Sequence, residues 1–92
     1  MSYRIIYTPS YNRKAAKFLR KHPDLANQYL KTLQILELNP HHPSLRLHRL
    51  SGTLNELYSV SINLSYRITL ELQISEKEIV PINIGSHDEV YR

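Results

Sequence analysis

The chain has 92 residues, 41% of them hydrophobic, so it can form one small hydrophobic core and is not a disordered polar tail. It has no cysteine, no long apolar run and no charged-then-apolar leader, which predicts a cytoplasmic protein of one domain over residues 1–92 without disulfides, a thiolate metal site or a membrane partner. The net charge of +4 is uneven, because residues 1–50 hold nine Lys or Arg against two acids, and this suits both a polyanion-binding surface and an ordinary solvated helix face.

The N-terminal segment predicts a strand followed by a helix. Residues 3–7, YRIIY, are bulky and favour β structure. Thr8 is a good N-cap and Pro9 suits the first helical position. Pro23 disfavours helical backbone at His22, so the helix is expected to end there.

A second helix is predicted over residues 25–38, with Asp24 as its N-cap and Asn39 and Pro40 as its stop. The link between the two helices is short, which predicts an antiparallel helix hairpin. The following HHPS, residues 41–44, is expected to be a loop.

The rest of the chain alternates between apolar and polar residues, as half-buried strands do. The strands are expected at residues 45–50, 56–63, 64–72 and 79–84. Pro81 cannot donate to a sheet ladder, which indicates an edge strand or a bulge. The predicted fold class is therefore α+β: an N-terminal strand, a helix hairpin and a four-stranded antiparallel sheet packed on the helices.

Strand alternation also predicts which side chains share a face of the sheet. The face toward the helices would hold Leu45, Leu47, Tyr58, Val60, Ile62, Tyr66, Ile68, Leu70, Leu72, Val80, Ile82 and Ile84. The opposite face would hold Arg46, His48, Ser59, Ser61, Arg67, Thr69 and Asn83. If the last strand continues, Gly85 and His87 join this polar face, and Asp88 points away from it.

Two arginines and two histidines on one exposed face suit cleavage of an RNA backbone without a metal. Such a reaction needs a base for the 2′-hydroxyl, a cation for the charge on the phosphorane and an acid for the leaving 5′-oxygen. Histidine serves as base or acid near neutral pH, and arginine offers a charged fork of donors. An outward arginine or histidine on a strand is equally compatible with a simple solvated surface. His41 and His42 are adjacent in a loop without a suitably spaced partner, so they are expected to be loop residues rather than metal ligands.

Several ordered stretches resemble the RelE/ParE toxin superfamily of type II toxin–antitoxin systems, and in particular its RelE/YafQ/YoeB branch. They are FLRKHPDL, NPHHPSLRLHRLSGTLNELYSVSI, SYRITLEL and IVPINIGSHDEVYR, which together cover nearly the whole chain. The resemblance implies a RelE-like fold and a ribosome-dependent endoribonuclease, an mRNA interferase that cuts mRNA in the A site without a metal or other cofactor. It also implies two kinds of partner, a small acidic antitoxin and the ribosome with its mRNA.

The resemblance assigns roles by position. The strand arginine of the family falls on Arg67 and the C-terminal histidine on His87, and His48 is our candidate for the general base. The positions expected to contact RNA are Arg46, Arg49, Tyr91 and, on the first helix, Arg13, Lys14 and Lys17. Tyr91 would stack on a base or only anchor the tail.

The sequence departs from its relatives at two points. YoeB-like toxins carry a glutamate before the LSG turn, where this chain has Arg46 and where the nearest acid, Glu56, follows the turn. YafQ-like toxins carry a histidine and an aspartate in the hairpin before the strand arginine, where this chain has NLSY. Two alternatives therefore stay open: a ParE-like toxin that poisons DNA gyrase by protein contact, and a catalytically degenerate toxin.

Overall fold

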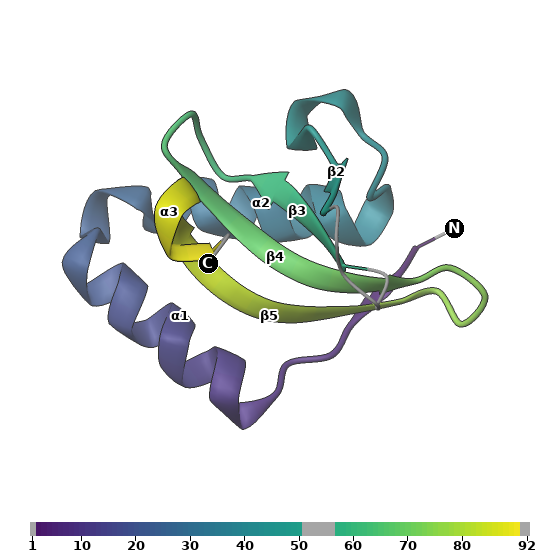
Figure 1. Cartoon of the computed structure of the whole chain (residues 1–92), viewed down its shortest axis with the longest axis horizontal. Coiled ribbons are helices and arrows are strands. Elements are labelled where there is room, and N and C mark those ends of the chain that lie inside the picture. Colours follow the sequence, from purple (N-terminus) through teal and green to yellow (C-terminus); the bar gives the residue numbers. More distant parts are fainter. Residues whose placement is uncertain (1, 51–56, 91–92) are drawn as a thin grey trace.

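The computed structural model describes residues 2–50 and 57–90, which form a five-stranded sheet with α2 behind it and α1 beside β5 (Figure 1). The elements are β1 (Arg4–Ile5), α1 (Pro9–Lys21), η1 (Pro23–Leu25), α2 (Ala26–Leu38), η2 (Pro43–Leu45), β2 (His48–Arg49), β3 (Leu57–Ser61), β4 (Tyr66–Gln73), β5 (Glu78–Ser86) and α3 (His87–Val90). No helix among these is long and apolar enough to cross a membrane.

The strand order is β1-β5-β4-β3-β2, and all neighbouring pairs are antiparallel except β1 and β5. The predicted α+β class and its four antiparallel strands are confirmed. The first strand is shorter than the predicted 3–7 and joins the same sheet in parallel, so the sheet is mixed and has five strands.

Helix α1 begins and ends where its sequence predicts. The Thr8 hydroxyl oxygen accepts a hydrogen bond from the Tyr11 backbone N–H at 3.1 Å, and Pro9 follows in the first turn. The helix ends at Lys21, where the backbone N–H of His22 donates to the Phe18 carbonyl. Proline at position 23 then prevents continuation.

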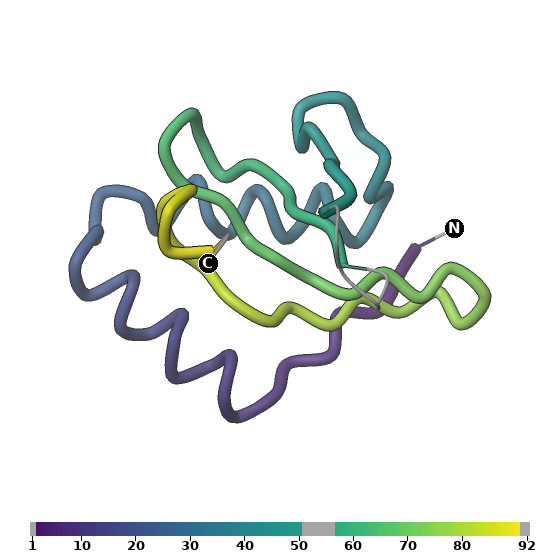
Figure 2. The backbone as a smooth tube through the Cα atoms, viewed as in Figure 1, coloured from purple at the N-terminus to yellow at the C-terminus, as the bar shows by residue number. Residues whose placement is uncertain are grey.

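The prediction of Asp24 as the N-cap of the second helix was wrong. Pro23 starts a short 3₁₀ turn, η1, that includes Asp24, so α2 begins at Ala26, one residue later than predicted, and its N-cap residue is Leu25 without a side-chain cap. The end of α2 before Asn39 is confirmed. The two helices leave η1 in different directions, with α2 behind the sheet and α1 beside β5 (Figure 2).

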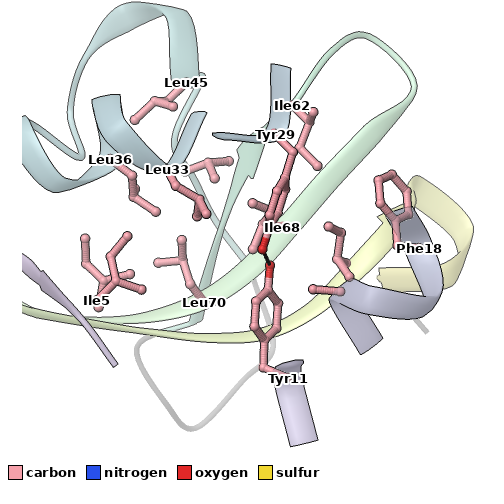
Figure 3. Packing of buried hydrophobic residues seen from close by; sticks show 14 of the residues in the cluster. Ile5, Tyr11, Phe18, Tyr29, Leu33, Leu36, Leu45, Ile62, Ile68 and Leu70 are labelled. Carbon is pink, nitrogen blue, oxygen red and sulfur yellow. Dashed lines mark hydrogen bonds between the residues drawn. The ribbon is translucent and has the colours of Figure 1, made fainter. Parts of the chain in front are cut away.

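The core lies between the sheet and the two helices (Figure 3). Ile68 and Leu70 of β4 are fully buried against it, as predicted from alternation. The hydroxyls of Tyr11 and Tyr29 meet there in a hydrogen bond of 2.9 Å that links α1 to α2. Burial raises the pKa of both tyrosines, so both stay neutral.

The predicted faces of β5 were wrong for Val80 and Ile82. Ile79 and Pro81 are the residues buried in the core, whereas Ile82 is 38% exposed. The reason is a β-bulge: the ladder shifts register at the step between Thr69 and Leu70 of β4, so the alternation of β5 changes at that point. Beyond the bulge Ile84 is again on the core face, so the predicted faces hold for the C-terminal part of β5.

The predicted strand over 45–50 is reduced to the two residues of β2. Leu45 is buried at the end of η2, and Arg46 has a left-handed backbone with φ 48° and ψ 52°. A left-handed residue interrupts strand alternation, so Arg46 does not belong to the polar row of the sheet.

Candidate active site

Arg67 is held on the face of the sheet opposite α2 by three hydrogen bonds. Its Nε donates to the Ser59 hydroxyl at 3.0 Å, and its Nη2 donates to the backbone oxygens of Arg46 at 2.9 Å and Ser59 at 3.5 Å. Ser59 is fully buried, so its hydroxyl is a fixed support. The left-handed turn at Arg46 contributes its carbonyl oxygen to this site, a role that the sequence did not suggest.

The strand register brings the predicted polar residues onto one face. His48 pairs with Ser59, which pairs with Thr69, which pairs with Asn83. In the next row Ser61 pairs with Arg67 and Arg67 with Gly85. Directly opposed residues of antiparallel strands point to the same side of a sheet. Arg67 and His48 therefore share one face of the sheet, as predicted, and the side chain of His48 is exposed.

Arg49 lies on the opposite side of the sheet from His48. It pairs with Tyr58, whose ring packs against the core, so the ladder places Arg49 on the other side of the sheet from His48. Adjacent strand residues face opposite ways, so Arg49 does not join His48 on the face that carries Arg67. The expected contact of Arg49 with RNA stays a prediction.

His87 does not continue the last strand. The strand ends at Ser86, and His87 is the first residue of α3, with its side chain 74% exposed. Its Nδ1 is 3.7 Å from Oδ1 of Asp88, so the prediction that Asp88 points away was also wrong, because the backbone here is helical. His87 is nonetheless only two residues beyond Gly85, the strand partner of Arg67.

The two residues that turn the chain from β5 into α3, Ser86 and Glu89, were not identified from the sequence. Ser86 donates its backbone N–H to Oε1 of Glu89 at 2.8 Å, and the Glu89 backbone N–H donates to the Ser86 hydroxyl at 3.4 Å. This reciprocal pair of hydrogen bonds is a capping box. The sequence contains its S-x-x-E pattern in SHDE, residues 86–89, so the capping box could have been predicted. The bonds from Ser86, with smaller contributions from Lys21 and His22, hold the pKa of Glu89 below its usual value.

A basic groove lies between α1 and the C-terminal half of β5. It has a volume of about 210 Å³ and is lined by Lys14, Lys17, Phe18, Lys21, His22, Asn83, Ile84 and Glu89. The ammonium of Lys14 donates to the Ile82 carbonyl at 3.2 Å, which ties α1 to β5. Asn83 belongs both to this groove and to the face that carries Arg67, so the groove borders that face. Arg13 is exposed on α1 but is not among the lining residues.

His41 and His42 are loop residues, as predicted. Nδ1 of His42 accepts a hydrogen bond from the backbone N–H of Ser44 at 3.1 Å, and the Ser44 hydroxyl lies 2.8 Å from the same nitrogen. Within residues 2–50 and 57–90, no three His, Cys, Asp or Glu side chains come together in a group that could hold a metal ion. Tyr91 and Glu56, both singled out in the sequence, lie outside the described residues.

Several solved structures with a similar fold are described as toxins or as toxin–antitoxin complexes. A chain of the E. coli DinJ–YafQ toxin–antitoxin complex matches with a TM-score of 0.78 at 16% identity over 100% of both chains. The YoeB/ParE toxin of Agrobacterium tumefaciens matches with a TM-score of 0.73 at 14% identity, over 91% of this chain and 98% of its own. A chain of the archaeal RelE–RelB complex from Pyrococcus horikoshii matches with a TM-score of 0.71 at 22% identity, over 94% and 96%.

No protein-family model matches the sequence, and no curated protein matches it significantly. The likeness to solved structures therefore concerns the fold, and that fold is the one shared by RelE, YafQ and YoeB/ParE toxins. The resemblance predicted from the sequence is confirmed at this level.

Proposed function

We propose that this chain is the toxin of a type II toxin–antitoxin system, one domain over residues 1–92, and that it acts in the cytoplasm as a ribosome-dependent endoribonuclease. The observation that carries the proposal is the order of the site across the sheet. Arg67 is on β4, His48 is on β2 to one side of it, and His87 follows β5 on the other side.

This order suits in-line attack on a phosphodiester. The nucleophile and the leaving group lie on opposite sides of the phosphorus, so the base and the acid are needed on opposite sides of the stabilising cation. With the phosphate at Arg67, His48 removes the proton from the 2′-hydroxyl as that oxygen attacks phosphorus. His87 donates a proton to the 5′-oxygen as the P–O5′ bond breaks. The products are a 2′,3′-cyclic phosphate and a 5′-hydroxyl.

The guanidinium of Arg67 has further N–H donors that can bind the phosphorane. A guanidinium has five N–H donors, and the three bonds to Ser59 and Arg46 use only Nε and Nη2. In the described part of the chain these bonds leave the two N–H groups of Nη1 for a phosphate oxygen. A cation already fixed in place costs no reorganisation when charge develops, which is the basis of transition-state stabilisation by such groups.

The basic groove supplies contacts that do not depend on base identity. Lys14 and Lys17 line it, Arg13 is exposed on the same helix, and Arg46 is exposed beside the Arg67 site. We propose that these side chains bind phosphates of ribosomal RNA or mRNA. Tyr91 is proposed to stack on a base next to the cleaved bond.

The positive charge of the basic groove also suits the binding of an acidic antitoxin. Two of the structures with this fold are complexes with the DinJ and RelB antitoxins. We propose that a small acidic antitoxin covers the basic groove and the Arg67 face, with a segment that orders on binding.

Primer extension on mRNA in a translating extract tests this function. The wild type is expected to give cuts at codon positions, and Arg67→Ala to lower the cleavage rate by about 100- to 1,000-fold. His48→Gln and His87→Gln are each expected to lower the rate by about 100-fold or more. Lys31→Ala removes an exposed charge from α2, on the other side of the sheet, and is the matched control. Intact mRNA together with gyrase-dependent DNA breaks would instead identify a ParE-like toxin.

A further inference from the structure

The position of His87 depends on a helix that is too short to be stable alone. Helix α3 has four residues, and isolated helices of this length do not persist in water. The strand ladder fixes the backbone only as far as Ser86, which pairs with Tyr66. The direction of the chain beyond Ser86, and with it the position of the His87 side chain, needs another source of order.

The capping box provides this order. Its two hydrogen bonds, 2.8 and 3.4 Å, join Ser86 to Glu89 across His87 and Asp88 and close the first turn of α3. The next residue, Val90, is buried and docks the end of the turn. His87 therefore lies inside a ring that is closed by Ser86 and Glu89, directly after the strand that pairs with β4.

Gly85 makes room for the capping box. A Cβ added at this residue would lie 2.9 Å from Oε1 of Glu89, closer than real Cβ atoms approach other atoms, and 3.0 Å from Cβ of Glu89, which is an unusually tight contact. The absence of a side chain at Gly85 thus leaves the space in which Glu89 reaches the Ser86 amide. Because Gly85 is the strand partner of Arg67, the box is formed over the strand position that neighbours the arginine.

We propose that Ser86 and Glu89, with Gly85 beneath them, are positioning residues that hold His87 at the Arg67 site. Neither side chain touches the reacting atoms. This assignment rests on the proposed function, since it gives His87 its place in the cleavage of RNA. A misplacement of about 1 Å of a catalytic group can cost about 100-fold in rate, so an unclosed box is expected to slow the chemical step.

The variants follow from the geometry. Glu89→Ala removes the acceptor for the Ser86 amide, whereas Glu89→Gln keeps a carbonyl acceptor and is the conservative variant, because glutamine also serves in capping boxes. Gly85→Ala keeps both Ser86 and Glu89 but adds a methyl group against the side chain of Glu89. Asp88→Ala removes the neighbouring carboxylate, 3.7 Å from the His87 ring, and leaves the box intact.

The test combines backbone order with cleavage. The ¹⁵N heteronuclear NOE of residues 87–90 reports whether α3 is ordered, and single-turnover cleavage on saturating ribosome–mRNA complexes reports the chemical step without the binding step. Glu89→Ala and Gly85→Ala are expected to lose order at residues 87–90 and to cleave about 10- to 100-fold more slowly at unchanged ribosome affinity. Glu89→Gln is expected to restore both, and Asp88→Ala to retain the order.

Two results would overturn the proposal. One is an unchanged NOE at residues 87–90 in Glu89→Ala and Gly85→Ala. The other is a lost NOE with the single-turnover rate of the wild type, since the box would then order the tail without positioning a catalytic group. If the wild type itself cleaves no mRNA, the proposed function fails, and the proposed role of the capping box in positioning a catalytic histidine fails with it. The NOE of residues 87–90 still shows in that case whether the capping box orders α3.

Discussion

Removal of the Ser59 hydroxyl is expected to slow cleavage while leaving Arg67 in place. The hydroxyl accepts one of the two short hydrogen bonds of the guanidinium, at 3.0 Å, and the 2.9 Å bond to the Arg46 carbonyl remains. A hydrogen bond to a charged group contributes about 1.5–3 kcal/mol. Arg67 is half-buried, so water replaces part of this, and the expected loss in Ser59→Ala is about 1 kcal/mol, or about fivefold in rate.

The assay is single-turnover cleavage of mRNA on ribosomes, with unfolding in urea measured in parallel. Thr69→Val is the control, because Thr69 is buried next to Ser59 in the same row and its hydroxyl has no bond to Arg67. We expect Thr69→Val to cleave at close to the wild-type rate. A wild-type rate in Ser59→Ala, with Arg67→Ala inactive, would refute the idea that Ser59 orients the guanidinium.

Three further predictions concern stability, binding and pH. Tyr11→Phe leaves the buried Tyr29 hydroxyl without its partner and is expected to lower the free energy of unfolding by about 1–3 kcal/mol in urea titrations, and an unchanged value would contradict the role of this pair. Replacing Lys14 and Lys17 with glutamine is expected to reduce the slope of log affinity for single-stranded RNA against log salt by about 0.7 for each lost phosphate contact, whereas Lys31→Gln leaves it unchanged. Folding lowers the pKa of Glu89 from 4.5. The stabilisation of α3 by the Glu89 carboxylate is therefore complete above pH 4.5 and is lost as the pH falls through the folded-state pKa. A pH titration of the amide NMR signals of residues 87–90 is expected to show this loss.

Local patterns predicted much of this fold. Thr8, Pro9 and Pro23 bound α1 because N-caps and prolines act on the adjacent backbone alone. The faces of β3 and β4 followed from alternation, since both strands pair without interruption along the predicted residues. The same alternation correctly predicted that Arg67 and His48 share one face of the sheet.

The errors came from features that depend on the rest of the structure. Pro81 indicated an edge strand or a bulge, and the structure has a bulge next to it. The effect of this bulge on the two faces depends on the pairing of β5 with β4, so the pattern of β5 alone did not reveal that Ile79 and Pro81 are buried. The left-handed backbone of Arg46 is an exception to the preferences of a non-glycine residue, and it is held by the η2 turn. The parallel place of β1 beside β5 is a long-range contact that no local pattern encodes.

The end of the chain is a different case, because two patterns overlap there and predict different backbones. The alternation of β5 suggested that the strand continues through His87, whereas the capping box of Ser86 and Glu89 ends it. In both cases His87 lies two residues beyond Gly85, the strand partner of Arg67. The two patterns differ in the neighbours of the histidine, and the structure shows that Glu89 shares its turn.

Whether cleavage needs the 2′-hydroxyl of the mRNA decides whether the protein is a metal-independent endoribonuclease of the proposed kind. Ribosomes are programmed with an mRNA that carries either ribose or 2′-deoxyribose at the cleaved nucleotide of the A-site codon, and the ends of the fragments are analysed. The wild-type protein is expected to cut the ribose mRNA, to leave a 2′,3′-cyclic phosphate upstream and a 5′-hydroxyl downstream, and not to cut the deoxy mRNA. Equal cutting of both mRNAs, or of neither, would rule out attack by the 2′-hydroxyl on the ribosome.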